Sequence, residues 1–211
     1  MMDDGEDVRF DWRRGGAAAL GLLAALILMA MVFAVKLAND AREQALSAER
    51  HSYEVALIVR NVSANISKAE AALARFVLDE NPKTSGNIYA SDWQLAGYQI
   101  DQLKDLERNS PAQLRRVAEL ERLFDKRDQE LSLAAHAALA RQGDTGIRYF
   151  YQASHGANNQ PSTGDLLEKK LDEIIRAERA SRAGQIEQSD YSSAQADNLT
   201  SYLSWLGIIV G

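Results

Sequence analysis

The sequence predicts an all-α protein: a transmembrane helix, then an elongated antiparallel four-helix bundle running into a second, truncated transmembrane helix. Two observations carry this prediction. The 211 residues are rich in Ala, Leu, Glu, Gln and Arg and hold only three prolines, a composition that favours helix. Apolar residues also recur at alternating steps of four and three between two apolar ends of the chain, which is typical of packed helices.

These patterns divide the chain into four parts. They are a cytoplasmic tail (1–14), a first transmembrane helix (15–36), an extracytoplasmic helical domain (37–198) and the start of a second transmembrane helix (199–211). The net charge of −6 argues against a nucleic-acid partner. The absence of cysteine excludes a disulfide framework, a thiolate metal site and a cysteine nucleophile.

The first apolar segment runs from Gly15 to Val35 without a charged residue. Its length of about 21 residues matches the roughly 20 that cross a bilayer core. A cleaved signal peptide is the alternative, but its apolar region is normally shorter, and residues 36–40 offer no small-residue cleavage site. We therefore expect an uncleaved helix in the inner (cytoplasmic) membrane. The pair Arg13-Arg14 directly before it favours a cytoplasmic N-terminus and a periplasmic domain.

The far end of the chain, residues 199–211, turns apolar again and carries Tyr202 and Trp205, residue types that favour a membrane interface. Thirteen residues are too few to span. The segment is either a short amphipathic tail or, as we expect, the first turns of a second membrane helix.

Between the membrane segments the helical periodicity is strong. A first apolar stripe keeps heptad spacing over Val55, Val59, Val62, Ile66, Ala69, Leu73 and Phe76. This stripe packs either within the bundle or across a dimer. We expect the helix to end at residues 79–82, because Pro82 disfavours helix at the residue before it.

Three further helical segments follow. One carries Tyr89, Trp93, Ala96, Ile100 and Leu103, and the next begins at Ser110-Pro111 with a capping-box pattern to Gln113. Its stripe includes Arg127, which we expect to snorkel at the edge of the core; a buried polar switch is the alternative. Residues 142–164 are either a long loop or a loop with one short helix, and a last helix starts at about Asp165.

Residues 70–82 resemble the most recognisable stretch of the CHASE3 family, extracytoplasmic sensor domains between two membrane helices of bacterial sensor histidine kinases, chemoreceptors and cyclic-di-GMP enzymes. That stretch has a glutamate, an Arg-Gly-Tyr-Leu-Leu run and a small-acidic-proline turn. Ala74 stands at the arginine of the family pattern and Arg75 at its glycine, so the basic charge is displaced by one position. The family-motif positions of this chain are Glu70, Arg75, Phe76, Leu78 and Pro82.

The resemblance implies a membrane-anchored input domain that relays an extracytoplasmic signal through two membrane helices to a cytoplasmic output beyond Gly211. The expected output is a histidine kinase. The implied partners are the lipid bilayer, a second copy of the chain and a small-molecule or protein signal. A response regulator would be reached only through the output domain. Alternatives are the input region of a chemoreceptor or a diguanylate cyclase, or a non-signalling helical scaffold.

We expect no catalytic, cofactor-binding or metal-binding residues, and therefore no enzyme, within these 211 residues. The three histidines fit no metal-binding or phospho-accepting motif, and no phosphate-binding glycine loop is present. The candidate ligand-binding residues are the aromatic group near the two predicted loops, whose alternative role is to cap the core. They are Tyr89, Trp93, Tyr149, Tyr151 and His155.

Overall fold

A computed structural model of the chain describes residues 12–155 and 160–184, and the side chains from residue 21 onward. All regular structure in these residues is helical, which confirms the predicted all-α class. The chain divides into two compact units, Met1–Ser47 and Ala48–Gly211. The predicted second membrane segment, residues 199–211, lies outside the described residues.

The N-terminal unit is built from the first part of helix α1, which runs from Trp12 to Asp79 over 68 residues. Among the described residues this is the one helix long and apolar enough to cross a membrane, and its most apolar window has no buried residue. Its large side chains, such as Leu26, Met29 and Phe33, are exposed. A core helix of a water-soluble protein buries such side chains, and this segment does not.

Helix α1 ends where the sequence predicts, at Asp79. Glu80 adopts a left-handed conformation with φ of 47°, and Asn81 caps the following π-helical turn η1 (Pro82–Gly86) by accepting a hydrogen bond from Lys83 N. The hydroxyl of Ser85 donates back to the Asp79 carboxylate. The chain therefore reverses direction within a few residues.

Helices α2 (Asn87–Leu106) and α3 (Pro111–Leu139) follow the reversal. The predicted start of α3 is confirmed, because the Ser110 hydroxyl accepts a hydrogen bond from Gln113 N and Pro111 occupies the first helical position. Arg141, with φ of 55°, ends this stretch and leads into α4.

Helix α4 (Gly143–His155) occupies much of the segment predicted as a loop, so the version with one short helix is correct. The last described helix spans residues 163–184, beginning two residues before the predicted start. A Cβ on Gly146, in the first turn of α4, would lie 3.3 Å from Cγ1 of Val77, in the last turn of α1. The start of α4 therefore lies against the end of α1.

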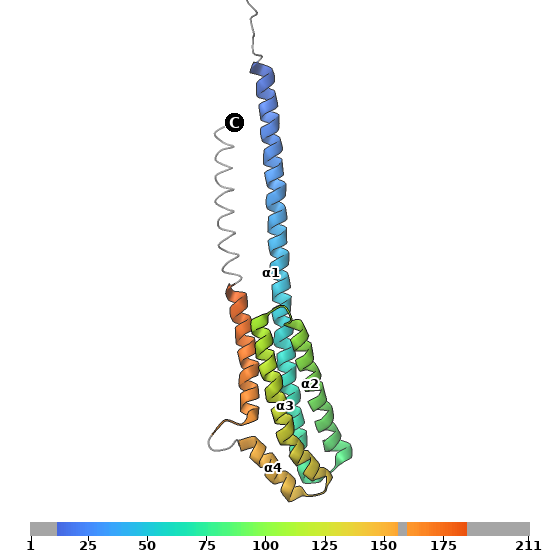
Figure 1. Ribbon diagram of the computed structural model, residues 1–211. Helices are drawn as coiled ribbons and strands as arrows, with labels where there is room; N and C mark the ends of the chain where they lie inside the picture. The colour runs from blue at the N-terminus through green and yellow to red at the C-terminus, as the bar shows by residue number, and fades with distance from the viewer. Residues whose placement is uncertain (1–11, 156–159, 185–211) are drawn as a thin grey trace, which may run out of the picture. The chain divides into compact units, whose positions relative to one another are not determined.

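Within the second unit, α2, α3, the later part of α1 and residues 163–184 lie side by side, with α4 crossing at one end (Figure 1). Side-chain contacts show that α3 and residues 163–184 run in opposite directions. Glu119 contacts Lys170 and Glu130 contacts Thr163, so numbers rise on α3 as they fall on residues 163–184. One core contains buried residues from all of these helices, which makes the fold bundle-like.

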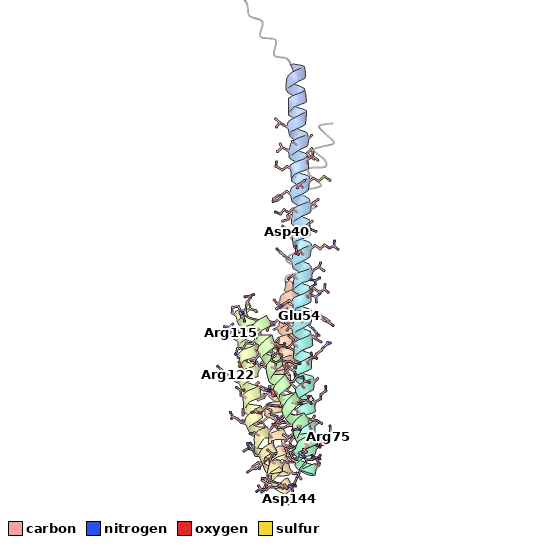
Figure 2. The ribbon with its side chains drawn as sticks, turned by 90° about the vertical axis from the view of Figure 1, so that its right-hand side faces the viewer. Asp40, Glu54, Arg75, Arg115, Arg122 and Asp144 are labelled. Atoms are coloured by element: carbon pink, nitrogen blue, oxygen red, sulfur yellow. The ribbon has the colours of Figure 1, made fainter. Side chains whose placement is uncertain are left out.

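The apolar stripe of α1 is confirmed as a buried face, since every member from Val55 to Phe76 is at most 7% exposed in the single chain. Charged residues occupy the outer faces, among them Arg75 on α1 and Arg115 and Arg122 on α3 (Figure 2). The stripe thus packs within the chain. A dimer of this protein would need another surface.

Candidate functional site

The most unusual feature of the core is a buried guanidinium, that of Arg127 on α3, whose residue is 2% exposed. The prediction that Arg127 snorkels at the edge of its stripe is therefore wrong. Its Nε donates to Oε1 of Glu70 on α1 at 2.8 Å, and its Nη1 donates to the carbonyl oxygen of Ala153 on α4 at 2.6 Å. Burial is possible because these partners replace the water that a charged group would lose.

A second set of contacts ties the arginine to the beginning of the last described helix. Glu130, one turn along α3, lies 3.5 Å from Arg127 Nη1 and accepts a hydrogen bond from the Thr163 hydroxyl at 2.7 Å. Gly164 leaves room for the guanidinium, because a Cβ there would lie 3.3 Å from Arg127 Nη2. Contacts of this one side chain and its direct partner thus reach α1, α3, α4 and residues 163–184.

The helix of residues 163–184 starts with a reciprocal cap beside the arginine. Ser162 Oγ accepts a hydrogen bond from Asp165 N at 3.1 Å, and Asp165 Oδ2 accepts one from Ser162 N at 2.9 Å. Hydrogen bonds from Ser162, with a smaller effect of the Arg127 charge, hold the pKa of Asp165 below its usual range. The cap fixes the start of the helix against the Arg127 cluster.

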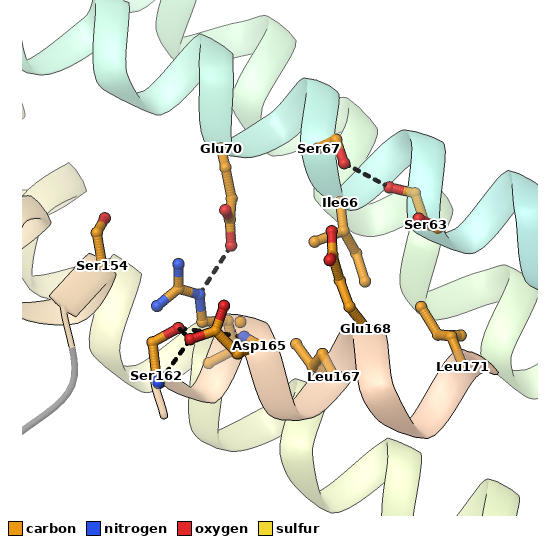
Figure 3. A pocket seen from close by; sticks show the side chains of 12 residues that line it. Ser63, Ile66, Ser67, Glu70, Ser154, Ser162, Asp165, Leu167, Glu168 and Leu171 are labelled. Atoms are coloured by element: carbon orange, nitrogen blue, oxygen red, sulfur yellow. Dashed lines mark hydrogen bonds and ion pairs between the residues drawn. The ribbon is translucent and has the colours of Figure 1, made fainter. Parts of the chain in front are cut away.

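A small polar pocket of about 200 Å³ opens between α1, α4 and residues 162–171, next to the Arg127 guanidinium. Figure 3 shows Glu70, Asp165 and Glu168 around it, with the hydroxyls of Ser154 and Ser162. Carboxylate and hydroxyl oxygens outnumber cationic groups in this lining. The pocket therefore suits a small polar molecule that offers hydrogen-bond donors rather than an anion.

The structure gives the family-motif positions distinct roles. Glu70 is the carboxylate that pairs with Arg127, Phe76 is buried in the core, and Pro82 begins η1. Arg75 and Leu78 are exposed on α1. Sequence reasoning singled out Glu70 and Arg127 for separate reasons and did not pair them, since they lie 57 positions apart.

The candidate aromatic residues form two separate ring groups in the described structure. Tyr89 and Trp93 pack in the core, where Trp93 stacks on Phe124 at 4.5 Å between ring centroids. Tyr151 and His155 stack on each other on the exposed side of α4, at 3.9 Å, and Tyr149 is also exposed. Burial raises the pKa of Tyr89 to about 12. Ligand binding by either group stays a prediction.

A second titratable cluster lies where α2 ends, away from the pocket, and sequence reasoning missed it. It consists of His51 on α1, Glu107 directly after α2, and Glu178 within residues 163–184. No spacing rule could reveal it, because the three residues come from three helices that only the tertiary fold brings together.

No protein-family model, curated protein or solved structure matches this chain. The likeness of residues 70–82 to the CHASE3 pattern therefore stays a prediction.

Proposed function

We propose that this chain is the signal-input portion of a transmembrane receptor, with a sensor histidine kinase as its output. The observation that carries the proposal is the continuity of α1. The same helix contains an exposed apolar segment long enough to span a bilayer and, further along, the buried stripe from Val55 to Phe76 that lines the domain core. A displacement of this helix in the domain can reach the membrane segment without any unfolding.

In this proposal residues 15–36 anchor the chain in the cytoplasmic membrane with the N-terminus inside. Residues 37–198 form an extracytoplasmic antiparallel four-helix bundle, and residues 199–211 begin a second membrane helix. Two features support the anchor: the length of the apolar segment and the exposure of side chains such as Leu26 and Phe33. The pair Arg13-Arg14 supports the direction.

The Arg127 cluster is the element through which we propose that the signal acts. Its hydrogen bonds join α1, α3 and α4 at fixed distances, so any sliding of Glu70 past Arg127 has to break them. Packed cores with such networks have discrete arrangements rather than continuous ones. The polar pocket beside the cluster gives a small molecule with hydrogen-bond donors direct access to Glu70.

A chimera tests the signalling role. Residues 1–211 are joined to the cytoplasmic portion of a sensor histidine kinase in each helical phase of one heptad, and autophosphorylation is measured in membrane vesicles. In the phase that yields a regulated kinase, Arg127→Lys should change the basal rate several-fold. The matched control Arg108→Lys alters an exposed pair with Asp105 and should leave the rate unchanged. Equal rates for both variants in every phase would refute the role of the cluster.

Reporter fusions test the orientation. Alkaline phosphatase inserted beside Asp144, an exposed residue, should be active, and a green fluorescent protein at the same place should be dark after Sec-dependent export. The reverse result would place the domain in the cytoplasm and end the proposal of an extracytoplasmic sensor.

Dimerisation and the type of output are separate parts of the proposal. Crosslinking in membranes through cysteines placed on exposed positions should capture a homodimer. The sequence that follows Gly211 discriminates the outputs: a phospho-accepting histidine motif with ATP-binding glycine motifs indicates a kinase and, through it, a response regulator partner. A Gly-Gly-[Asp/Glu]-Glu-Phe stretch indicates a cyclase, a long heptad array a chemoreceptor, and an early stop the scaffold.

A further inference from the structure

The second titratable cluster joins three helices of the core around one buried carboxylate. His51 Nε2 lies 3.7 Å from Oε1 of Glu107, and one ligand atom from each of His51, Glu107 and Glu178 lies within 4.8 Å of the other two. The fourth long helix also takes part, because Gln113 on α3 donates from Nε2 to Oε2 of Glu178 at 3.2 Å. Side chains from α1, α3, residues 163–184 and the residue that directly follows α2 thus meet at this place.

Within this cluster, Glu107 is the residue whose side chain lacks hydrogen-bond partners among the described residues. Its side chain is 1% exposed, and among the described residues neither of its oxygens accepts a hydrogen bond. A buried carboxylate without partners is strongly destabilising, and the nearby carboxylate of Glu178 adds repulsion. Burial and then Glu178 raise the pKa of Glu107. A cation between the two carboxylates would offset both penalties.

The types of ligand atom select among cations. One imidazole nitrogen and two carboxylate oxygens form a three-ligand set for zinc, whose fourth position is open to water. Calcium and magnesium ions prefer six or more oxygen ligands, and nitrogen is a poor ligand for either ion. A zinc ion at 2.0–2.2 Å from its ligands keeps them about 3.4 Å apart, so the His51–Glu107 separation of 3.7 Å is already close to that spacing.

We propose that His51, Glu107 and Glu178 form a binding site for a divalent transition cation of the zinc class, with Gln113 orienting Glu178. A bound ion would fasten α1 to residues 163–184 at the end of the domain nearest in sequence to the apolar segment. Outer partners such as Gln113 commonly hold metal-binding carboxylates in place. This proposal does not depend on the proposed signalling function, because the packing of the core alone brings the three ligand residues together.

Zinc titration of the full chain tests the proposal. Residues 1–211 are purified in detergent with a histidine-free affinity tag, freed of metal with EDTA, and titrated with ZnCl₂ against a chromophoric zinc chelator. We expect one zinc per chain, bound in the presence of excess Mg²⁺ and Ca²⁺. Replacement of Zn²⁺ by Co²⁺ should produce the intense visible absorption of a four-coordinate nitrogen–oxygen site.

Three variants make the test specific. Glu107→Gln, which keeps the size of the side chain, and His51→Ala should each weaken zinc binding by about tenfold or more. His136→Ala removes an exposed histidine outside the site and should bind zinc as the wild type does. Circular dichroism of each variant checks that the helices remain folded.

The proposal is overturned if the wild type binds zinc no more tightly than Glu107→Gln, which would mean that the cluster holds protons only. It is equally overturned if His136→Ala loses as much affinity as His51→Ala, which would indicate adventitious coordination by surface histidines. A failure of the kinase chimera would leave this result untouched.

Discussion

Arg127 and Glu107 are both ionisable and both almost fully buried in the same core, but the core surrounds Arg127 with hydrogen-bond partners and Glu107 with none among the described residues. Arg127 is surrounded by Glu70, Glu130 and a carbonyl oxygen, at distances that satisfy its charge. Glu107 has a single near partner, His51 at 3.7 Å, and no hydrogen bond among the described residues. The core therefore completes one site by itself and leaves the other to be completed by a proton or an ion.

This difference suggests different uses of buried charge. A satisfied cluster such as that of Arg127 specifies one arrangement of the helices, because alternative registers would leave the guanidinium unpaired. An unsatisfied carboxylate such as Glu107 lowers the stability of the folded chain. A ligand that binds it relieves this penalty and therefore stabilises the fold. Five substitutions can break or sharpen the contrast.

The largest effect is expected from Arg127→Met. Removal of one partner of a buried pair leaves Glu70 and the Ala153 carbonyl oxygen without their donor, so unfolding should become easier by about 3–5 kcal/mol. Chemical denaturation of the full chain, followed by circular dichroism, measures this loss. The double variant Arg127→Met with Glu70→Gln should recover part of it, and no recovery would argue that the two side chains are not coupled.

A smaller effect is expected at the cap next to this cluster. Ser162→Ala removes the oxygen that accepts from Asp165 N, and loss of such a cap costs about 1 kcal/mol. The same denaturation experiment applies. Ser132→Ala, which changes a hydroxyl bonded only to the Gln129 carbonyl oxygen within α3, is the control and should unfold like the wild type. Similar losses in both variants would deny the cap a special role.

The response to pH should have opposite signs at the two sites. The raised pKa of Glu107 means that its penalty is absent below its ordinary value of 4.5 and grows as the pH rises above it. Without metal, Glu107→Gln should therefore be more stable than the wild type near neutral pH and lose that advantage as the pH falls towards 4.5.

Asp165, beside Arg127, has a lowered pKa, so its contribution is present above 3.8 and lost as the pH falls below that value. Asp165→Asn should consequently be less stable than the wild type at neutral pH, and the difference should shrink in acid. Thermal unfolding between pH 3 and 8 measures both variants. Parallel curves for wild type and Glu107→Gln would contradict an uncompensated carboxylate.

The smallest effect is expected at the exposed ring pair of α4. Tyr151 is 61% exposed and contacts His155 by stacking, so Tyr151→Ala should change the unfolding free energy by no more than about 0.5 kcal/mol. The variant is mainly a test of ligand binding. If signalling by the chimera survives both Tyr149→Ala and Tyr151→Ala, these rings do not bind the signal. Trp93→Ala, which empties a core position, serves as the destabilising comparison.

The sequence by itself determined the helical class, the apolar segment, the buried stripe of α1 and the positions of its end and of the α3 start. These features follow from local rules: the helical period places residues on one face, and Pro82, Ser110 and Pro111 act on their immediate neighbours. Such signals lie within a few residues of the feature that they predict, so they can be read from the local sequence alone.

Only the tertiary structure decided where the charges of the core lie. Arg127 looked like an edge residue because its partners, Glu70 and the Ala153 carbonyl oxygen, are 57 and 26 positions away. His51, Glu107 and Glu178 carried no joint signal for the same reason. The free energy of a buried charge depends on atoms within a few ångströms in space, and those neighbours exist only once the helices have packed.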